Sequence, residues 1–370
     1  LTSIGSYAFQ NCKALTTVAF NSEITTIGAY AFSGCTGLTG DLTIPESVTS
    51  IGNYAFSGCT GLNGKLTIEG NAEATTIGQY AFNGCTKITV LELGDGITSI
   101  GASAFRDCYG IKGDLVIPDT VTSLGAYAFY NCYGFDGTLT LSNKITTIPE
   151  NAFALCKNFT GELVIPDSVT TIQNNAFSYL STSSSHQSQM SKITSIVIGE
   201  KVAKIGTNDG YYYNPFYGMT GVREITFKGI SVPSRGYADI FYSMNSLETV
   251  YVPSESYSAY VSAFSSYVNN GKIMMSDSNP EDEFVISNKT LLLYQGEGGE
   301  VTIPAGVESI GQSAFQNCTT ITSVTFNEEL KSVGSYAFSG CTNLASVTIN
   351  KDLTSIGSYA FQNCKALTTV

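Results

Sequence analysis

Cysteine is the residue type through which this chain could most readily do chemistry, because thiols form disulfides, bind metals and act as nucleophiles. The ten cysteines all stand three residues after a phenylalanine, and they are Cys12, Cys35, Cys59, Cys85, Cys108, Cys132, Cys156, Cys318, Cys341 and Cys364. In three similar segments the same place holds Leu180, Met219 or Met244. A place that accepts Cys, Leu or Met favours apolar packing, so we expect buried free thiols.

Disulfides and metal binding are the two alternatives for these thiols. If the chain coils, neighbouring cysteines would have Cα atoms about 5 Å apart, which is within the range of a disulfide. Cysteines 23 residues apart form a row and not a tetrahedron, which argues against a metal site. Disulfides are therefore the minority expectation, and we expect neither a metal site nor a cofactor.

The only histidine, His186, lies in the Ser-rich run STSSSHQSQMSK at residues 181–192. Serine near histidine could form part of a hydrolase site, but the sequence supplies no orienting acid and no fixed nucleophile geometry. Polar low-complexity runs are typical of loops. We therefore expect a solvated loop, no catalytic residue and no enzyme.

Two neighbouring segments, GTNDGYYYNPFYGM at 206–219 and RGYADIFYSM at 235–244, are crowded with tyrosine. Their tyrosines are Tyr211, Tyr212, Tyr213, Tyr217, Tyr237 and Tyr242. Exposed tyrosine favours binding because it offers a large contact area at a low entropy cost. These six residues are a candidate binding patch. The alternative is that the rings fill space where the chain is irregular.

An internal repeat positions most of these residues. The dipeptide Ala-Phe recurs mostly every 23 or 24 residues, in a unit that reads roughly V-T-S-I-G-x-Y-A-F-x-G-C-x-x-L-T-x-V-T-I-P. This period is within the ~20–29 residues of a leucine-rich repeat, in which each coil buries its apolar side against its neighbours. The expected repeat core consists of Phe32 with Cys35, Phe56 with Cys59, Phe82 with Cys85, Phe105 with Cys108, Phe129 with Cys132, Phe153 with Cys156, Phe315 with Cys318, and Phe338 with Cys341.

Each unit predicts two strands and one turn. The L-T-x-V-T-I stretch alternates apolar and polar residues, as a half-buried strand does, and I-T-T-I-G is a second such run that ends at a glycine turn. For x-Y-A-F-x-x-C we expect one helical or 3-10 turn, which would place Phe and Cys on the same side. Units with an extra residue beside a glycine, such as TGLTGDLTIP at 36–45, predict a small bulge.

A tyrosine stands two residues before many of the repeat phenylalanines, and stacked coils would align these tyrosines into a ladder. The row consists of Tyr7, Tyr30, Tyr54, Tyr80, Tyr127, Tyr336 and Tyr359. We expect a structural role for it in preference to a binding role. The concave sheet, with Thr and Ser at alternate strand positions, is the other candidate contact surface, since curved solenoids usually bind there.

Charge and hydropathy exclude several classes of partner. The formal net charge of −12 argues against binding nucleic acid or anionic lipid, both of which need clustered Lys and Arg. No stretch approaches the ~20 consecutive apolar residues of a membrane-spanning helix. The chain starts without Met or a signal peptide, so we expect a processed or trimmed piece.

The repeat units resemble those of a known family. IPESVTSIGNYAFSGC at 44–59, IPDTVTSLGAYAFYNC at 117–132 and IPAGVESIGQSAFQNC at 303–318 are similar to the BspA-like leucine-rich repeats of bacterial surface proteins. The resemblance implies a β-rich repeat solenoid, a right-handed superhelix of 23–24-residue units. It also implies a secreted or cell-surface protein that adheres to host or matrix proteins or to other cell-surface molecules. It carries over no catalytic or metal-binding residues.

We expect one repeat array interrupted by caps. The expected segments are an array at 1–253 with irregular inserts at 181–192 and 206–217, a closing helical cap at 254–275, an acidic linker at 276–283, an opening hairpin cap at 284–300 and further repeats at 301–370.

The same eighteen residues, LTSIGSYAFQNCKALTTV, stand at 1–18 and at 353–370. Two arrangements remain open, a window cut from a longer protein or a natural order in which 281–370 runs into 19–275. With either arrangement we expect end-to-end self-stacking, because the open coils would contact each other.

These patterns favour a non-enzymatic extracellular module for protein binding or adhesion, acting through a solenoid face or through the tyrosine-rich irregular repeats. The alternative is a structural spacer or stalk that presents another domain.

Overall fold

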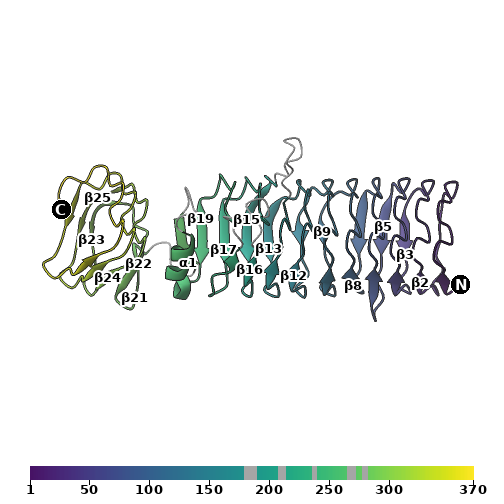
Figure 1. Cartoon of the computed structure of the whole chain (residues 1–370), viewed down its shortest axis with the longest axis horizontal. Coiled ribbons are helices and arrows are strands. Elements are labelled where there is room, and N and C mark those ends of the chain that lie inside the picture. The colour runs from purple at the N-terminus through teal and green to yellow at the C-terminus, as the bar shows by residue number, and fades with distance from the viewer. Residues whose placement is uncertain (179–189, 207–213, 236–239, 265–271, 277–281) are drawn as a thin grey trace. The chain divides into compact units, whose positions relative to one another are not determined.

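The computed structural model describes residues 1–178, 190–206, 214–235, 240–264, 272–276 and 282–370. The chain divides into two compact units, Leu1–Thr249 and Val250–Val370. In both units the chain winds into stacked coils, and strands from successive coils lie side by side (Figure 1).

The short strands that precede the repeat glycine or its equivalent line up along the first unit as a six-stranded and a four-stranded parallel sheet, which we together call the Ile-Gly sheet. Its strands are β1 (Ser3–Ile4), β2 (Thr26–Ile27), β4 (Ser50–Ile51), β6 (Thr75–Ile77), β8 (Ile97–Ile100) and β10 (Ser123–Leu124), followed by β12 (Thr147–Ile148), β14 (Thr171–Ile172), β16 (Lys204–Ile205) and β18 (Ser234–Arg235). The register keeps equivalent residues together, since Ile27 pairs with both Ile4 and Ile51.

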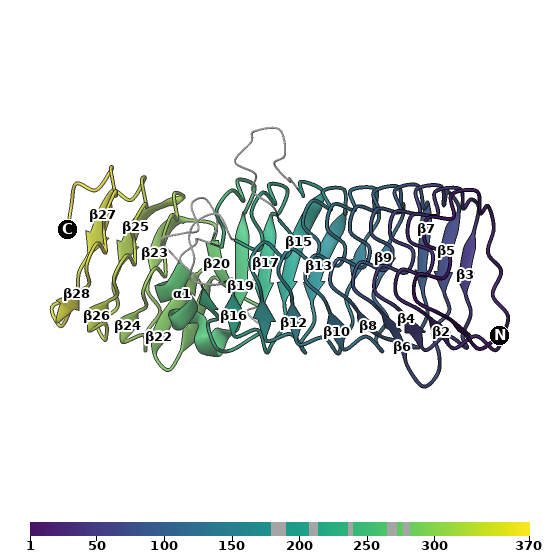
Figure 2. The same cartoon turned by 45° about the vertical axis from the view of Figure 1, so that its right-hand side comes forward.

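The other strands of this unit form three further parallel sheets, which we together call the Ile-Pro sheet because three of the strands lead into Ile-Pro, at 44–45, 117–118 and 165–166. Its strands are β3 (Leu42–Ile44), β5 (Lys65–Ile68), β7 (Val90–Leu93), β9 (Leu115–Val116), β11 (Leu139–Thr140), β13 (Gly161–Ile165), β15 (Ile193–Ile198) and β17 (Glu224–Phe227). Figure 2 separates β3, β5 and β7 of this sheet from β2, β4 and β6 of the other. Along β3 the burial alternates, with Leu42 and Ile44 buried and Thr43 exposed, as the sequence pattern predicts.

The second unit combines a helix with a shorter stack of coils. Its elements are β19 (Thr249–Val252), which starts at the last residue of the first unit, η2 (Ser254–Ser256), α1 (Tyr257–Phe264), β20 (Lys272–Met275), β21 (Phe284–Ser287), β22 (Thr290–Tyr294), β23 (Gly299–Thr302), β24 (Ser309–Ile310), β25 (Ile321–Thr325), β26 (Ser332–Val333), β27 (Ser346–Thr348) and β28 (Ser355–Ile356). Strands β21 and β22 pair antiparallel as a hairpin. Asn288 and Lys289 join them with φ of 48° and 62°, which suits a tight hairpin turn.

The phenylalanine segment of each coil is a series of turns and not the helical turn that the sequence predicts. Phe32 N donates to the carbonyl of Ala55 in the next coil at 2.7 Å, whereas Cys35 N donates back to Phe32 O at 3.1 Å. Tyr30 and Gly34 have φ of 57° and 73°. Because left-handed residues interrupt a right-handed helix, the segment turns repeatedly and bonds to its neighbours. Over the described residues, helix is limited to η2 and α1.

A bulge lies beside Gly161, in a unit of the predicted kind, KNFTGELVIP at 157–166, but the extra residue belongs to the opposite strand. Gly161 pairs with Ile193 but Glu162 pairs with Ser195, so the opposite strand has one extra residue, Thr194. Gly161 has a φ of 82°, a conformation that glycine adopts at little cost.

The core of the first unit is a ladder of stacked phenylalanines. Ring centroids of successive coils are between 5.1 and 5.8 Å apart from Phe9 to Phe216. From Phe56 to Phe177 these side chains are completely buried. The coil interior is therefore apolar, and the predicted β-rich repeat solenoid is confirmed.

Candidate functional site

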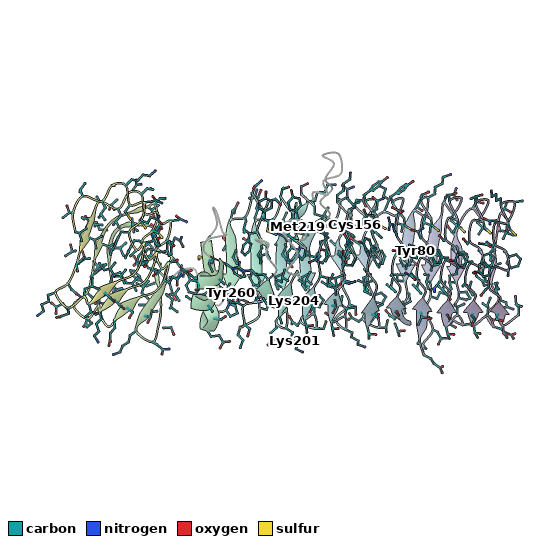
Figure 3. All side chains as sticks on the ribbon, in the orientation of Figure 1. Tyr80, Cys156, Lys201, Lys204, Met219 and Tyr260 are labelled. Carbon is teal, nitrogen blue, oxygen red and sulfur yellow. The ribbon has the colours of Figure 1, made fainter. Side chains whose placement is uncertain are left out.

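The cysteines form a second ladder beside the phenylalanines. All ten are free thiols, and eight of them are buried. Cys59 Sγ donates to Phe32 O of the preceding coil at 3.1 Å, and Cys85 Sγ donates to Phe56 O at 3.2 Å. The same bond recurs at Cys35, Cys108, Cys132, Cys156, Cys341 and Cys364. The sequence pattern identified an apolar slot but gave no sign of this donor function. Met219 occupies the slot in a later coil, at the same edge of the stack as Cys156 (Figure 3).

Burial makes these thiols poor candidates for chemistry. Burial raises the pKa of the Cys59 and Cys108 thiols to about 12, so the nucleophilic thiolate is scarce at neutral pH. In the ranges that the structure describes, no group of three or more His, Cys, Asp or Glu side chains is placed to hold a metal ion. His186 lies outside the described residues.

The tyrosine-rich patch is described only in part. Tyr217 and Tyr242 come together, with ring centroids 5.8 Å apart and planes 24° apart. Tyr242 is 53% exposed. Tyr237 and the run 211–213 lie outside the described residues. The stacked pair is therefore the part of the predicted patch that the structure places.

The tyrosine row forms a stacked ladder at one turn of the coils. Tyr7, Tyr30, Tyr54 and Tyr80 have centroids 4.9, 4.6 and 4.7 Å apart in succession. Each of them has a positive φ, between 55° and 63°. Because each ring covers the face of the next, mainly ring edges are left for a partner.

The ladder is interrupted where Ser103 replaces tyrosine. There the Arg106 guanidinium lies 5.9 Å from the Tyr127 ring centroid and 4.8 Å from that of Tyr130. The cation therefore packs against the aromatic faces at the interruption. A second short run of the row, Tyr336 and Tyr359, stacks in the other unit at 5.1 Å.

Exposed apolar side chains gather on and beside the outer face of the Ile-Pro sheet. Among the described residues of the first unit beyond its first coil, the large exposed apolar side chains are Val90, Tyr109, Val116, Tyr133, Val164, Ile230 and Tyr242. Val90, Val116 and Val164 lie on strands of this sheet and are 41%, 54% and 40% exposed. Tyr109 and Tyr133 stack at 5.2 Å in the turns that lead into its strands. We call Val116, Thr140 and Val164 the valine row, since they hold equivalent positions in three successive coils.

Carboxylates stand on both sides of the valine row. The strand segments DLVIPD at 114–119 and ELVIPD at 162–167 each place an acid two residues before the valine and another three residues after it. We call Asp114, Asp119, Glu162 and Asp167 the acidic margins. The sequence pattern of alternating Thr and Ser favoured a sheet surface as a contact site but gave no sign of these valines, although the repeated motif at 114–119 and 162–167 was a readable signal.

Hydrogen bonds between coils hold the acidic margins in place. Asp114 Oδ1 accepts from the backbone N and the hydroxyl of Thr138 at 2.6 and 2.8 Å, and Asp119 Oδ1 accepts from Asn143 N at 2.8 Å. These bonds lower the pKa of both aspartates, so the carboxylates are charged at neutral pH. Asp167 Oδ1 accepts in the same way from Glu200 N at 3.0 Å.

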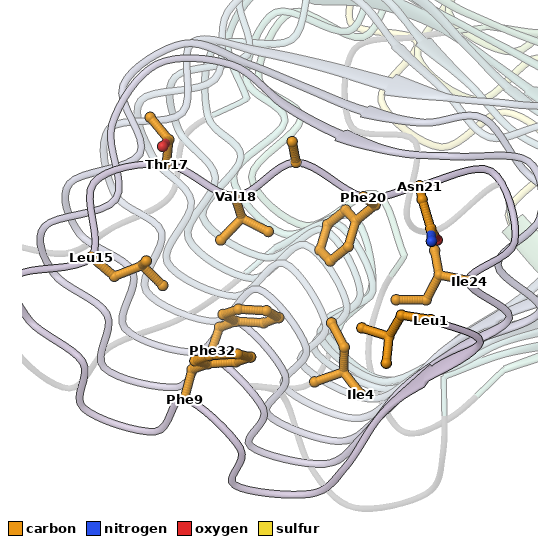
Figure 4. A pocket seen from close by; sticks show the side chains of 11 residues that line it. Leu1, Ile4, Phe9, Leu15, Thr17, Val18, Phe20, Asn21, Ile24 and Phe32 are labelled. Atoms are coloured by element: carbon orange, nitrogen blue, oxygen red, sulfur yellow. The ribbon is translucent and has the colours of Figure 1, made fainter.

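An apolar pocket of about 350 Å³ lies at the first coil (Figure 4). Phe9, Phe20 and Phe32 are among its lining residues, and no charged side chain lines it. Phe9 and Phe32 belong to the phenylalanine ladder, so the pocket lies against the first rings of the stack.

Parallel coils of 23 or 24 residues around a phenylalanine ladder define a leucine-rich-repeat solenoid. The family model described as BspA type leucine rich repeat region matches residues 2–136, 137–196, 181–291 and 293–370. The chain belongs to this family.

Several solved structures are similar to the chain. A leucine-rich repeat protein from Bacteroides ovatus is 22% identical, with 99% of this chain and 86% of that chain covered and a TM-score of 0.45. A leucine rich cell surface protein from Faecalibacterium prausnitzii is 23% identical, with 100% and 82% covered and a TM-score of 0.36. The leucine-rich repeat protein of T. pallidum is 20% identical, with 64% and 86% covered and a TM-score of 0.36. No protein with a curated description matches the chain. Across the described ranges, no helix is both long enough and apolar enough to cross a bilayer.

Proposed function

We propose that this chain is a non-enzymatic protein-binding module of a bacterial surface protein and that it acts in adhesion. Its partners are host or matrix proteins or other cell-surface molecules. The observation that carries the proposal is the concentration of exposed Val90, Val116 and Val164 on one sheet face, beside the exposed pair Tyr109 and Tyr133. Larger groups of exposed apolar residues mark interaction sites on soluble proteins.

The build of the solenoid supports a binding role over a catalytic one. A leucine-rich-repeat solenoid is a scaffold whose surface varies while its stacked core is kept. Here the core thiols are buried and bonded to carbonyls, so they are withheld from reaction with solutes. An extracellular location is supported by the family and by the description of the Faecalibacterium relative as a cell surface protein.

Surface plasmon resonance with the full chain tests the proposal. Purified host matrix proteins and surface glycans are immobilised, and we expect saturable binding to at least one of them. The double variant Val116→Lys/Val164→Lys should abolish that binding, because two long charged side chains cover the exposed row.

Ser123→Lys is the matched control, since Ser123 is exposed in the same coil as Val116 but belongs to the Ile-Gly sheet. It should bind as the unchanged chain does. Absence of binding by the folded, unchanged chain to every immobilised molecule would contradict the proposal and leave the spacer function. Equal loss in both variants would contradict the choice of face.

The stacked pair Tyr217 and Tyr242 is a second candidate contact, because Tyr242 is more than half exposed. Tyr242→Ala tests it in the same assay, with Tyr109→Ala as the comparison.

A further inference from the structure

We propose that the valine row and its acidic margins bind a cationic amphipathic helix that lies along the stacking direction of the coils. This inference rests on the proposed binding function and names the chemistry of the partner. The helix would place its apolar side chains on Val116, Thr140 and Val164. Its Lys and Arg side chains would reach the carboxylates on both sides.

The spacing of the coils matches the pitch of a helix. Near this face, the rings of Tyr109 and Tyr133 are 5.2 Å apart and those of Phe135 and Phe159 are 5.4 Å apart. An α-helix rises about 5.4 Å per turn, so a helix laid along the stack meets one coil with each turn. Residues i, i+4 and i+7 of the helix would then face three successive coils.

An extended partner fits this face less well. Side chains on one face of an extended chain recur about every 6.7 Å, which is longer than the spacing of the coils. Successive side chains of an extended partner would therefore not meet successive coils. Pairing with a strand is also blocked, because the strands of neighbouring coils already bond to one another, as Val116 does with Thr140.

Chain length sets an upper limit on the distance between the acidic margins. Asp114 and Asp119 are five residues apart in the chain. A fully extended segment of that length spans at most about 17 Å. A helix with its side chains is about 10–12 Å wide, which is below this limit.

Charge selects a cationic helix over an anionic one. The margins present four carboxylates around the valine row, and Asp136 adds an exposed carboxylate in the coil between them. One margin is already paired, since Lys228 Nζ lies 3.6 Å from Asp167 Oδ1. The carboxylates that form no ion pair among the described residues are Asp114, Asp119, Asp136 and Glu162, and the other lysines at this face are Lys112, Lys144 and Lys157. Four unpaired carboxylates therefore stand beside three ammonium groups, and the potential favours a cationic partner.

A synthetic peptide of about 18 residues, with Leu along one face and Lys on both flanks, is the probe, since it spans about 27 Å or five coils. Fluorescence anisotropy of the labelled peptide measures its affinity for the full chain. We expect saturable binding that weakens as salt rises from roughly 0.05 to 0.5 M. A peptide of the same pattern with Glu in place of Lys should not bind.

The decisive variant is Asp114→Asn/Asp119→Asn/Glu162→Gln/Asp167→Asn. Each amide keeps a side-chain oxygen, so the acceptors of the inter-coil bonds remain. This variant should bind the Lys peptide roughly tenfold more weakly or worse. The control Glu23→Gln/Glu328→Gln/Glu329→Gln/Asp352→Asn removes four exposed charges elsewhere and should keep the affinity.

Equal weakening in both variants would overturn the inference, because it would show general attraction to an acidic chain. Binding of the Lys peptide that persists in Val116→Lys/Val164→Lys would overturn it as well. If the peptide fails to bind while the resonance assay detects a matrix protein, the helix inference falls and the binding function stands. If neither assay detects binding, both fall.

Discussion

Removing one ring from the phenylalanine ladder should destabilise the first unit strongly. Phe105 is completely buried, and its ring stacks on Phe82 at 5.4 Å and on Phe129 at 5.2 Å. A buried Phe→Ala change costs about 3–5 kcal/mol, and loss of two stacked neighbours places Phe105→Ala at the upper end, about 5 kcal/mol. The free energy of unfolding falls by about 2–3 kcal/mol for each 1 M of urea, so the midpoint of unfolding should fall by roughly 2 M.

Urea unfolding followed by far-ultraviolet circular dichroism measures this change. The control is Tyr109→Ala, because Tyr109 stacks on Tyr133 and is 37% exposed. It should cost about 1 kcal/mol. A Phe105→Ala midpoint no lower than that of Tyr109→Ala would refute the reasoning that the phenylalanine ladder holds the coils together.

Three further outcomes are expected. Tyr54→Gly should lower the free energy of unfolding by about 1 kcal/mol in the same assay, because the strain relieved at the left-handed backbone offsets only part of the two lost ring stacks. Tyr54→Ala should lower it further, since alanine loses the same stacks and keeps the strain. In the native chain a thiol reagent should modify exposed Cys12 quickly and buried Cys59 only after unfolding, and rapid reaction of all ten thiols would contradict the buried row. Lys289 and Lys331 hold the pKa of Glu308 at about 2, so the stability that this carboxylate contributes is present above pH 4.5 and is lost as the pH falls toward 2. Glu308→Gln should therefore make the melting temperature depend less on pH between 4.5 and 2. The same pH dependence in this variant and in the unchanged chain would count against the ion pairs.

The stacked core was the most predictable part of the molecule. Phe105 and Cys108 recur at a fixed spacing, and a fixed spacing in a coil predicts a row. The predicted helical turn was wrong because Tyr30 and its equivalents have a positive φ, and a tyrosine in the sequence does not indicate that conformation. Glycine or asparagine at that place would have been a visible sign.

The candidate surface was predicted only coarsely. Alternation along the strands shows which residues face outward, so a sheet face could be proposed as a contact surface. The sequence alone did not show that Val116 and Val164 stay uncovered while other valines, such as Val121, are buried, since that depends on the register of the stacked coils.

Methyl NMR of the valine-labelled full chain tests the central claim most directly. On addition of the Lys peptide, the account predicts shifts at the methyl groups of Val116 and Val164, which are exposed on the sheet face, and none at buried Val48 and Val121. Saturation of these shifts should follow the anisotropy curve. Saturable binding that leaves the Val116 and Val164 methyl signals unmoved would contradict the account.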